Sequence, residues 1–199
     1  GLGDVYKRQV NDRLFDLKRR IILDTKETIM ITALQLFAKS GYDAVSVSDI
    51  SGALGLSKGA LYRHYVSKRD ILDCIVKRME QEDINRAKIF GVPDGSYDQM
   101  PQVYQEITVE KLIIYAKEEF AYWTKDEFAS SFRKMLTIEQ YKDKELQQLY
   151  QKHILEGVLS YLQDIFKFIN VPDKGKIENP KHIACLLYTS DAADDSLRV

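Results

Sequence analysis

The chain has 199 residues, of which 45% are hydrophobic and 30% charged, and its formal net charge is −1 at pH 7. This composition is ordinary for a soluble globular protein, and the charge balance excludes a global basic excess. No apolar run approaches the ~20 residues of a membrane span, and Cys74 and Cys185 offer neither a disulfide framework nor metal-ligand spacing. We therefore expect a cytoplasmic protein without a membrane partner, in which attraction to an acidic partner arises from local charge patterning.

Both ends of the chain resemble translated transposase adapters from sequencing libraries. Residues 4–9 can be encoded GAT GTG TAT AAG AGA CAG, and the reverse complement of that DNA encodes Cys-Leu-Leu-Tyr-Thr-Ser, which stands at residues 185–190. Folding does not explain an inverted repeat at the DNA level, and processing scars are excluded from fold reasoning. We therefore expect residues 1–9 and 185–199 to be adapter-derived, and the native sequence to be truncated after Ala184.

Residues 10–23 have two interpretations. Lys18, Arg19 and Arg20 can be encoded AAA AGG AGG, which resembles a bacterial ribosome-binding site, and Leu23 can be encoded by the start codon TTG. The segment is then an untranslated leader. The alternative is an N-terminal arm whose basic residues touch a nucleic acid.

The first helix is expected to begin at Asp24 or Thr25 and to end at Gly41. Its apolar residues, including Ile29 and Phe37, fall at helical spacing and form a small core. A unit of this size has little core of its own, so we expect it to pack against the helix that follows it.

Two short helices joined by a glycine turn are predicted next. Ser46 and Asp49 form a cap, because a serine oxygen accepts an orphan backbone N–H and an acid suits the N-terminus of a helix. Gly55 ends the helix, and Ser57 caps a second one over residues 58–65. This is the signature of a helix-turn-helix motif, whose second helix enters the major groove of DNA.

The charge pattern supports the same interpretation. No Asp or Glu occurs between Asp49 and Asp70. The interval contains basic and tyrosine residues instead, namely Lys58, Tyr62, Arg63, His64, Tyr65, Lys68 and Arg69. Such a surface suits a DNA duplex, whose phosphates dominate affinity. Two alternatives remain: a generic helical hairpin with a solvated basic edge, and a strand over residues 45–48, where polar and apolar residues alternate.

Residues 25–82 resemble the DNA-binding region of the TetR family of bacterial transcriptional regulators. The matching pieces are TKETIMITALQLFAKSGYDAVSVSDIS and GLSKGALYRHYVSKRDIL. The resemblance implies phosphate contacts, close backbone approach at Gly59, and base edges facing Ala60 and His64. The residues that it implies in DNA binding are Ser46, Ser57, Lys58, Gly59, Ala60, Tyr62, His64, Tyr65 and Lys68, with phosphates contacted by Lys58, Tyr62, Tyr65 and Lys68.

The rest of the chain is predicted to be helical. A linker helix begins at Ser67, and a loop rich in Pro and Gly follows it at residues 91–101. The further predicted helices cover about residues 108–123, a segment opening at Thr124 with Glu127 in a capping box, residues 143–169, and a segment from Asn179.

Aromatic residues are dense in this second half. Tyr115, Trp123, Phe132 and Tyr150 are candidates to line a pocket for an apolar effector. The alternative is that these residues are core, as aromatic residues at helical spacing usually are. The resemblance implies that this half binds a small molecule, whose identity the sequence does not give, and changes the spacing of two DNA readers.

The predicted fold is therefore all-α. A three-helix DNA-binding domain at residues 24–66 is followed by a linker helix and a helical effector and dimerisation domain at residues 67–184. The resemblance implies a repressor that an effector releases from a palindromic operator. It also implies that the full-length protein is a homodimer, whereas this fragment dimerises poorly and exposes apolar surface on residues 143–169.

Two other functions stay open: an architectural DNA-binding protein without an effector, and an all-helical enzyme. Catalysis has little support, because the sequence has no glycine-rich phosphate loop and no nucleophile elbow. His64, His153 and His182 lack the spacing of metal ligands. We therefore expect no catalytic residue, cofactor or metal.

Overall fold

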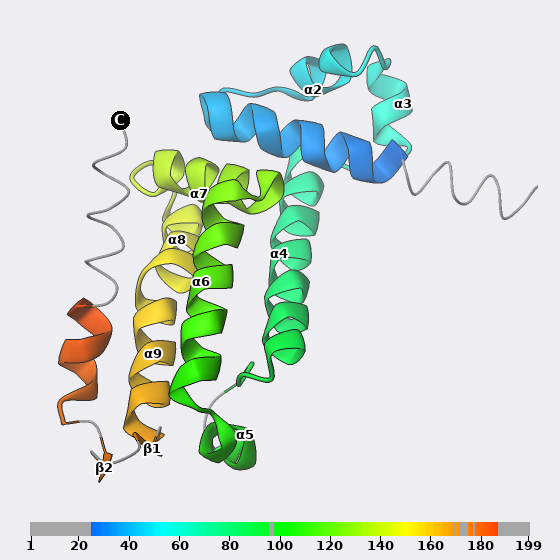
Figure 1. Ribbon diagram of the computed structural model, residues 1–199. Helices are drawn as coiled ribbons and strands as arrows, with labels where there is room; N and C mark the ends of the chain where they lie inside the picture. The colour runs from blue at the N-terminus through cyan, green and yellow to red at the C-terminus, as the bar shows by residue number, and fades with distance from the viewer. Residues whose placement is uncertain (1–24, 96–97, 169, 172–174, 177, 187–199) are drawn as a thin grey trace, which may run out of the picture. The chain divides into compact units, whose positions relative to one another are not determined.

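The computed structural model describes residues 25–95, 98–168, 170–171, 175–176 and 178–186 (Figure 1). Backbone contacts divide the chain into two compact units, Gly1–Lys77 and Arg78–Val199. Helix α4 (Lys68–Phe90) contributes its first part to the first unit and its second part to the other. Of the residues expected to be adapter-derived, 1–9 and 187–199 lie outside the described residues, as does the leader or arm at residues 10–23, whereas residues 185 and 186 are described and belong to a helix.

The first unit contains the helix of residues 25–40, then α2 (Val47–Ala53), α3 (Lys58–Tyr62) and the start of α4. Gly41 ends the first helix as predicted, with φ at +89°, a backbone conformation that glycine adopts without steric cost. The side chains that form the core of this unit are each at most 7% exposed, and they are Ile29, Met30, Ala33, Leu34, Phe37, Val45, Ile50, Leu61, Tyr65, Ile71, Leu72 and Ile75.

The second unit is a set of helices that pack on their neighbours along the chain. After α4 come α5 (Pro101–Glu106), α6 (Val109–Lys125), α7 (Glu127–Glu139), α8 (Lys144–Ile154) and α9 (Glu156–Phe168). Helix α7 packs on both α6 and α8, and α9 packs on both α8 and α5. A short antiparallel pair, β1 (Asn170–Val171) and β2 (Gly175–Lys176), follows with Asn170 opposite Lys176, and then a helix over residues 180–186. The all-α prediction is confirmed, apart from this two-residue pair of strands.

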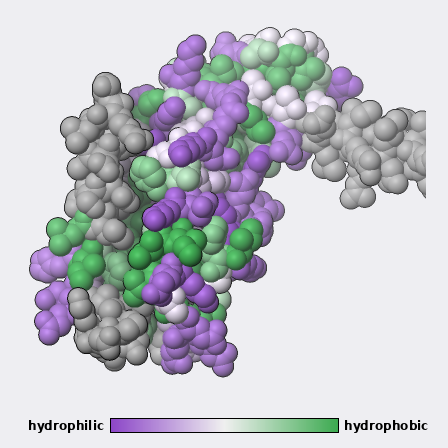
Figure 2. Space-filling model, viewed as in Figure 1, coloured by the Kyte–Doolittle hydropathy of each residue, from purple (hydrophilic) through white to green (hydrophobic). Residues whose placement is uncertain are grey.

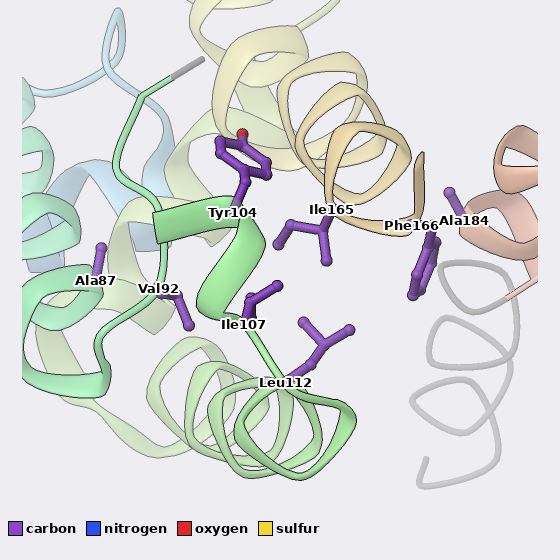
Figure 3. Close-up of a cluster of buried hydrophobic side chains, with 8 residues drawn as sticks. All are labelled: Ala87, Val92, Tyr104, Ile107, Leu112, Ile165, Phe166 and Ala184. Atoms are coloured by element: carbon purple, nitrogen blue, oxygen red, sulfur yellow. The ribbon is translucent and has the colours of Figure 1, made fainter. Parts of the chain in front are cut away.

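A cluster of eight buried residues ties α5 and α6 to α9 (Figure 3). Its members are Ala87, Val92, Tyr104, Ile107, Leu112, Ile165, Phe166 and Ala184. Tyr104 is 1% exposed, and its hydroxyl donates to the carbonyl oxygen of Gly95 at 3.0 Å. Burial, with the nearby charge of Asp164, raises the pKa of Tyr104 to about 12. The ring of Tyr104 also packs edge-on against Phe168, with centroids 5.8 Å apart.

Helix α5 differs from the sequence prediction, which places a loop at residues 91–101 and begins the next helix at about residue 108. Proline is favoured at the first position of a helix, where its missing N–H has no intrahelical partner in any case. Pro101 occupies that position in α5. The burial of Tyr104 then holds this short helix on the second unit.

Two further boundaries differ from the predictions. The predicted helix of residues 143–169 is two helices, because Leu155 leaves the helical region at φ −117° and ψ −93°. Gly157 lies in the next turn, where glycine is poor at propagating a helix. Thr124 does not cap α7. Its hydroxyl donates to the carbonyl oxygen of Phe120 inside α6, and Asp126 caps α7 by accepting from the N–H of Ala129.

The prediction of exposed apolar surface on residues 143–169 is wrong for the described residues. Every described position of α8 and α9 that is exposed carries a polar or charged residue. Exposed apolar side chains occur on α6 instead, where Ile113 is 49%, Ile114 54% and Phe120 37% exposed. The hydrophobic colour that gathers over α6 in Figure 2 reflects this surface.

Candidate nucleic-acid interface

Helix α2 begins with a complete capping box. The Ser46 oxygen accepts from the N–H of Asp49 at 3.2 Å, and the Asp49 carboxylate accepts from the N–H of Ser46 at 2.7 Å. The hydroxyl of Ser46 also donates to that carboxylate at 2.6 Å. The cap is confirmed, and it uses the one hydroxyl proton of Ser46, so a phosphate contact from this side chain would have to displace Asp49.

The hydrogen bonds of this cap predict how the Asp49 carboxyl titrates in acid. Hydrogen bonds from the side chain and backbone of Ser46 hold the pKa of Asp49 below its ordinary 3.8. Since the folded pKa is the lower one, the contribution of the cap to stability is present above 3.8 and is lost as pH falls through the folded pKa. An NMR titration should place Asp49 below 3.8, and Ser46→Ala should raise its pKa. A midpoint at or above 3.8 in the unsubstituted protein would contradict this.

Helix α3 is shorter than predicted. Ser57 caps it by accepting from the N–H of Ala60 at 3.1 Å, as expected, but the helix ends at Tyr62 rather than at residue 65. The next N–H groups bond three residues back, with Arg63 donating to Ala60 and His64 to Leu61. Such bonds tighten the last turn of a helix.

The outer surface of α3 carries most of the side chains that were assigned to DNA. Lys58, Gly59 and Arg63 are exposed, and Tyr62 is 50% exposed. Ala60 and His64 are half-buried. A Cβ added to Gly59 would meet nothing within 4 Å, so no neighbour among the described residues requires glycine there. The glycine therefore leaves this surface open to the close approach of another molecule.

Tyr65 lies in the core rather than on the predicted surface. It is 2% exposed, and its hydroxyl donates to the carbonyl oxygen of Lys26 at 3.0 Å. Burial raises the pKa of its phenol. The Lys26 ammonium lies over the Tyr65 ring, 4.9 Å from the ring centroid. The structure therefore assigns Tyr65 to holding α3 against the first helix, and its predicted phosphate contact is withdrawn.

Lys68 is also engaged by the protein. Its Nζ donates to the carbonyl oxygen of Tyr42 at 2.7 Å, and the residue is half-buried. Nine residues were predicted to bind DNA. Two of them, Tyr65 and Lys68, have partners inside the protein. The other seven lie on the surface of α2, α3 and their caps, called here the α2–α3 surface: Ser46, Ser57, Lys58, Gly59, Ala60, Tyr62 and His64.

The four aromatic residues proposed for the effector pocket have different surroundings. Phe132 is fully buried and lies edge-on to His153, with centroids 5.5 Å apart. Tyr115 is half-buried against Phe90 at 5.7 Å. The other two, Trp123 and Tyr150, are half-buried, and Trp123 packs on Tyr122. Phe132 is thus a core residue, and the pocket stays a prediction.

The polar contacts of two residues of the second unit were not predicted from the sequence. The Arg86 guanidinium forms two hydrogen bonds to Glu119, at 2.8 and 3.1 Å, and one to Asp83 at 2.8 Å. It also lies 3.4 Å from the centroid of the Tyr122 ring. The other residue is Tyr161, whose buried hydroxyl has no hydrogen-bond partner among the described residues. Nothing in the sequence distinguishes these residues from others on amphipathic helices.

Among the described residues, no group of three or more His, Cys, Asp and Glu side chains is placed to hold a metal ion. None of the described helices has the length and apolar character needed to cross a membrane. A shallow depression of about 380 Å³ lies at the α7–α8 turn, lined by residues 140–144 and Gln147. It contains none of the four aromatic residues proposed for the effector.

Known proteins resemble the first unit most clearly. The family described as bacterial regulatory proteins, tetR family, matches residues 29–75, which include α2, α3 and the start of α4. The regulator YwcC of Bacillus subtilis (strain 168) is 39% identical over 80 residues, 40% of this chain and 33% of YwcC. The regulator IcaR of Staphylococcus aureus (strain Newman) is 36% identical over 52 residues, 26% of this chain and 28% of IcaR.

These curated relatives are matched over no more than a third of their own lengths. The crystal structure of a gamma-butyrolactone receptor (ArpA-like protein) resembles a larger part of the chain. It aligns with a TM-score of 0.58 and 20% identity, covering 86% of this chain and 82% of the other. At that identity the likeness concerns the fold alone.

Proposed function

Because this chain is a member of the TetR family, through the DNA-binding domain in its first unit, we propose that the protein is a transcriptional regulator that binds duplex DNA with α2 and α3. Helix α3 enters the major groove in this proposal, and its basic and tyrosine side chains hold the phosphates. YwcC and IcaR, two of the relatives with matching sequence, are named as transcriptional regulators.

One observation carries the proposal. Two capped helices meet at Gly55, with φ at +63°, and they present Lys58, Tyr62 and Arg63 to solvent with no acidic residue on α3. Side chains of this kind neutralise phosphates, which supply the sequence-independent part of DNA affinity. The exposed glycine at position 59 is suited to close backbone approach to a base pair or phosphate.

The proposal is tested by DNA binding. Duplexes that the protein enriches from a random pool should bind specifically, and Lys58→Met and Tyr62→Ala should both weaken that binding. Loss of the Lys58 contact should also reduce the slope of log K against log salt by about 0.9, the value for one phosphate.

Lys39→Met is the matched control, because Lys39 is an exposed lysine on the first helix, outside the α2–α3 surface. It removes the same charge and should leave affinity and salt slope near those of the unsubstituted protein. Equal losses for Lys39→Met and Lys58→Met would mean that binding follows net charge alone. No enriched duplex at all would argue against the regulator.

The second unit is proposed to bind a small-molecule effector, with Tyr115, Trp123, Phe132 and Tyr150 near it. The hydroxyl of Tyr161, which has no hydrogen-bond partner in the described part of the chain, supports this idea, because a buried donor without a partner is costly and a ligand oxygen could accept from it. We also propose repression, effector-induced release from a palindromic operator, and a homodimer. IcaR is named a negative regulator, which supports the repressor role. Saturable loss of DNA binding on adding a compound would separate this regulator from an architectural protein.

A further inference from the structure

The ammonium of Lys68, the first residue of α4, is surrounded by the turn that precedes α2. Its Nζ donates to the Tyr42 carbonyl at 2.7 Å and lies 3.5 Å from the Asp43 carbonyl oxygen. The same Nζ lies 4.2 Å from the centroid of the Tyr42 ring. An ammonium has three N–H donors and no acceptor. Two carbonyl oxygens and one ring face are therefore enough to engage it from the protein side.

That turn determines where α2 begins. Gly41 donates its N–H to the Phe37 carbonyl at 2.8 Å, and Val45 donates its N–H to the Tyr42 carbonyl at 3.3 Å. Val45 is 4% exposed, and the next residue, Ser46, is the N-cap of α2. The Tyr42 carbonyl thus accepts from both Val45 and Lys68, so one oxygen joins the start of α4 to the entry of α2.

The turn is also anchored in the core of the first unit. The Tyr42 ring packs edge-on against Phe37, with centroids 5.0 Å apart and planes at 67°. Phe37 is fully buried. The Lys68 ammonium lies on a ring that the core already holds, which limits the positions that the turn and the following helix can take.

We propose that Lys68 is a positioning residue for DNA binding: its ammonium clamps the turn at residues 41–45, and this clamp holds α2 and α3 in the orientation that the groove requires. The role replaces the phosphate contact that the family resemblance implies for this lysine. The inference rests on the proposed function of α2 and α3 in DNA binding, while the clamp itself rests on the contacts of Lys68 with Tyr42 and Asp43.

The test compares Lys68→Met with Lys58→Met on a duplex enriched from a random pool. Methionine keeps most of the lysine stem and removes the ammonium. Lys68→Met should weaken binding by about tenfold, the scale of one charged hydrogen bond, with an unchanged salt slope. Lys58→Met should lower the salt slope by about 0.9. The slope therefore distinguishes a lost clamp from a lost phosphate contact.

Hydrogen exchange without DNA tests the clamp independently. The amides of Val45 and of α2 should exchange faster in Lys68→Met and should be unchanged in Lys58→Met. Tyr42→Leu keeps the carbonyl but removes the ring, so a smaller acceleration of the same amides is expected. This variant also keeps the test decisive if Lys68→Met does not fold.

If the salt slope falls by about 0.9 in Lys68→Met while exchange at Val45 is unchanged, Lys68 contacts a DNA phosphate and the proposed clamp is wrong. Unchanged exchange with unchanged affinity would overturn it as well. If the unsubstituted protein binds no duplex, the proposed function fails, and the exchange measurement still decides whether Lys68 holds the turn.

Discussion

Phe37→Ala is expected to lower the free energy of unfolding of the first unit by about 3–5 kcal/mol, the range for truncating a buried phenylalanine. Phe37 is fully buried, and its ring supports Tyr42 in the turn before α2. A small unit has little stability to spare. We therefore expect the variant to lose DNA binding because α2 and α3 are no longer held.

The measurement has to separate the two units. Hydrogen exchange at the amides of residues 25–40 reports the first unit, while the fluorescence of Trp123, the single tryptophan, reports the second. Val66→Ala is the matched control, since Val66 belongs to the same unit and is 84% exposed. It should change stability by no more than about 0.5 kcal/mol. Equal effects of the two substitutions would show that Phe37 does not support the core.

Arg86→Met should destabilise the second unit by about 2 kcal/mol. Removing one partner of a fully buried pair costs about 3–5 kcal/mol. The side chains of Arg86 and Glu119 keep 14% and 22% exposure, so water screens part of that cost. Burial alone would lower the pKa of Arg86, but the hydrogen bonds and charge of Glu119 outweigh it and raise the pKa, so the guanidinium is charged at any pH of interest.

Denaturant unfolding followed by Trp123 fluorescence measures this loss. Lys152→Met is the control from the same unit, because the Lys152–Glu80 pair is 60% and 42% exposed. Exposed pairs contribute about 0–1 kcal/mol. The double variant Arg86→Met/Glu119→Met should be more stable than Arg86→Met, since it leaves no Glu119 carboxylate without its arginine. A double variant that is less stable than the single one would contradict the role of this pair.

The features that sequence analysis predicted correctly are local ones. Ser46, Ser57 and Ser67 each accept from a backbone N–H three residues further on, so the donor and acceptor lie within one turn of chain. Gly41 and Gly55 adopt positive φ, a requirement visible in the residue type itself. These signals need no knowledge of the rest of the fold.

The features that were missed depend on residues far apart in sequence. Tyr65 was assigned to the surface by the family resemblance and by its basic neighbours, whereas its partner, Lys26, lies 39 residues earlier. Pro101 is compatible with either a break or the first position of a helix, and the packing of Tyr104 on Phe168, which stabilises helix α5, is not visible in any local pattern. The break at Leu155 likewise separates two helices that share one continuous apolar spacing.

The Tyr65–Lys26 hydrogen bond has a consequence for the order of folding. The capping bonds of α2 and α3 close loops of three residues, whereas this bond closes a loop of 39. Closing a longer loop costs more chain entropy, so contacts between distant residues form after local ones. The capped turns can therefore appear within the rapid phase of helix formation, and the docking of Tyr65 on the first helix is the slower step that completes the first unit. A substitution that lowers stability can slow folding, speed unfolding or do both. The share of the lost stability that appears in the folding rate should therefore differ between substitutions at the caps and substitutions at Tyr65.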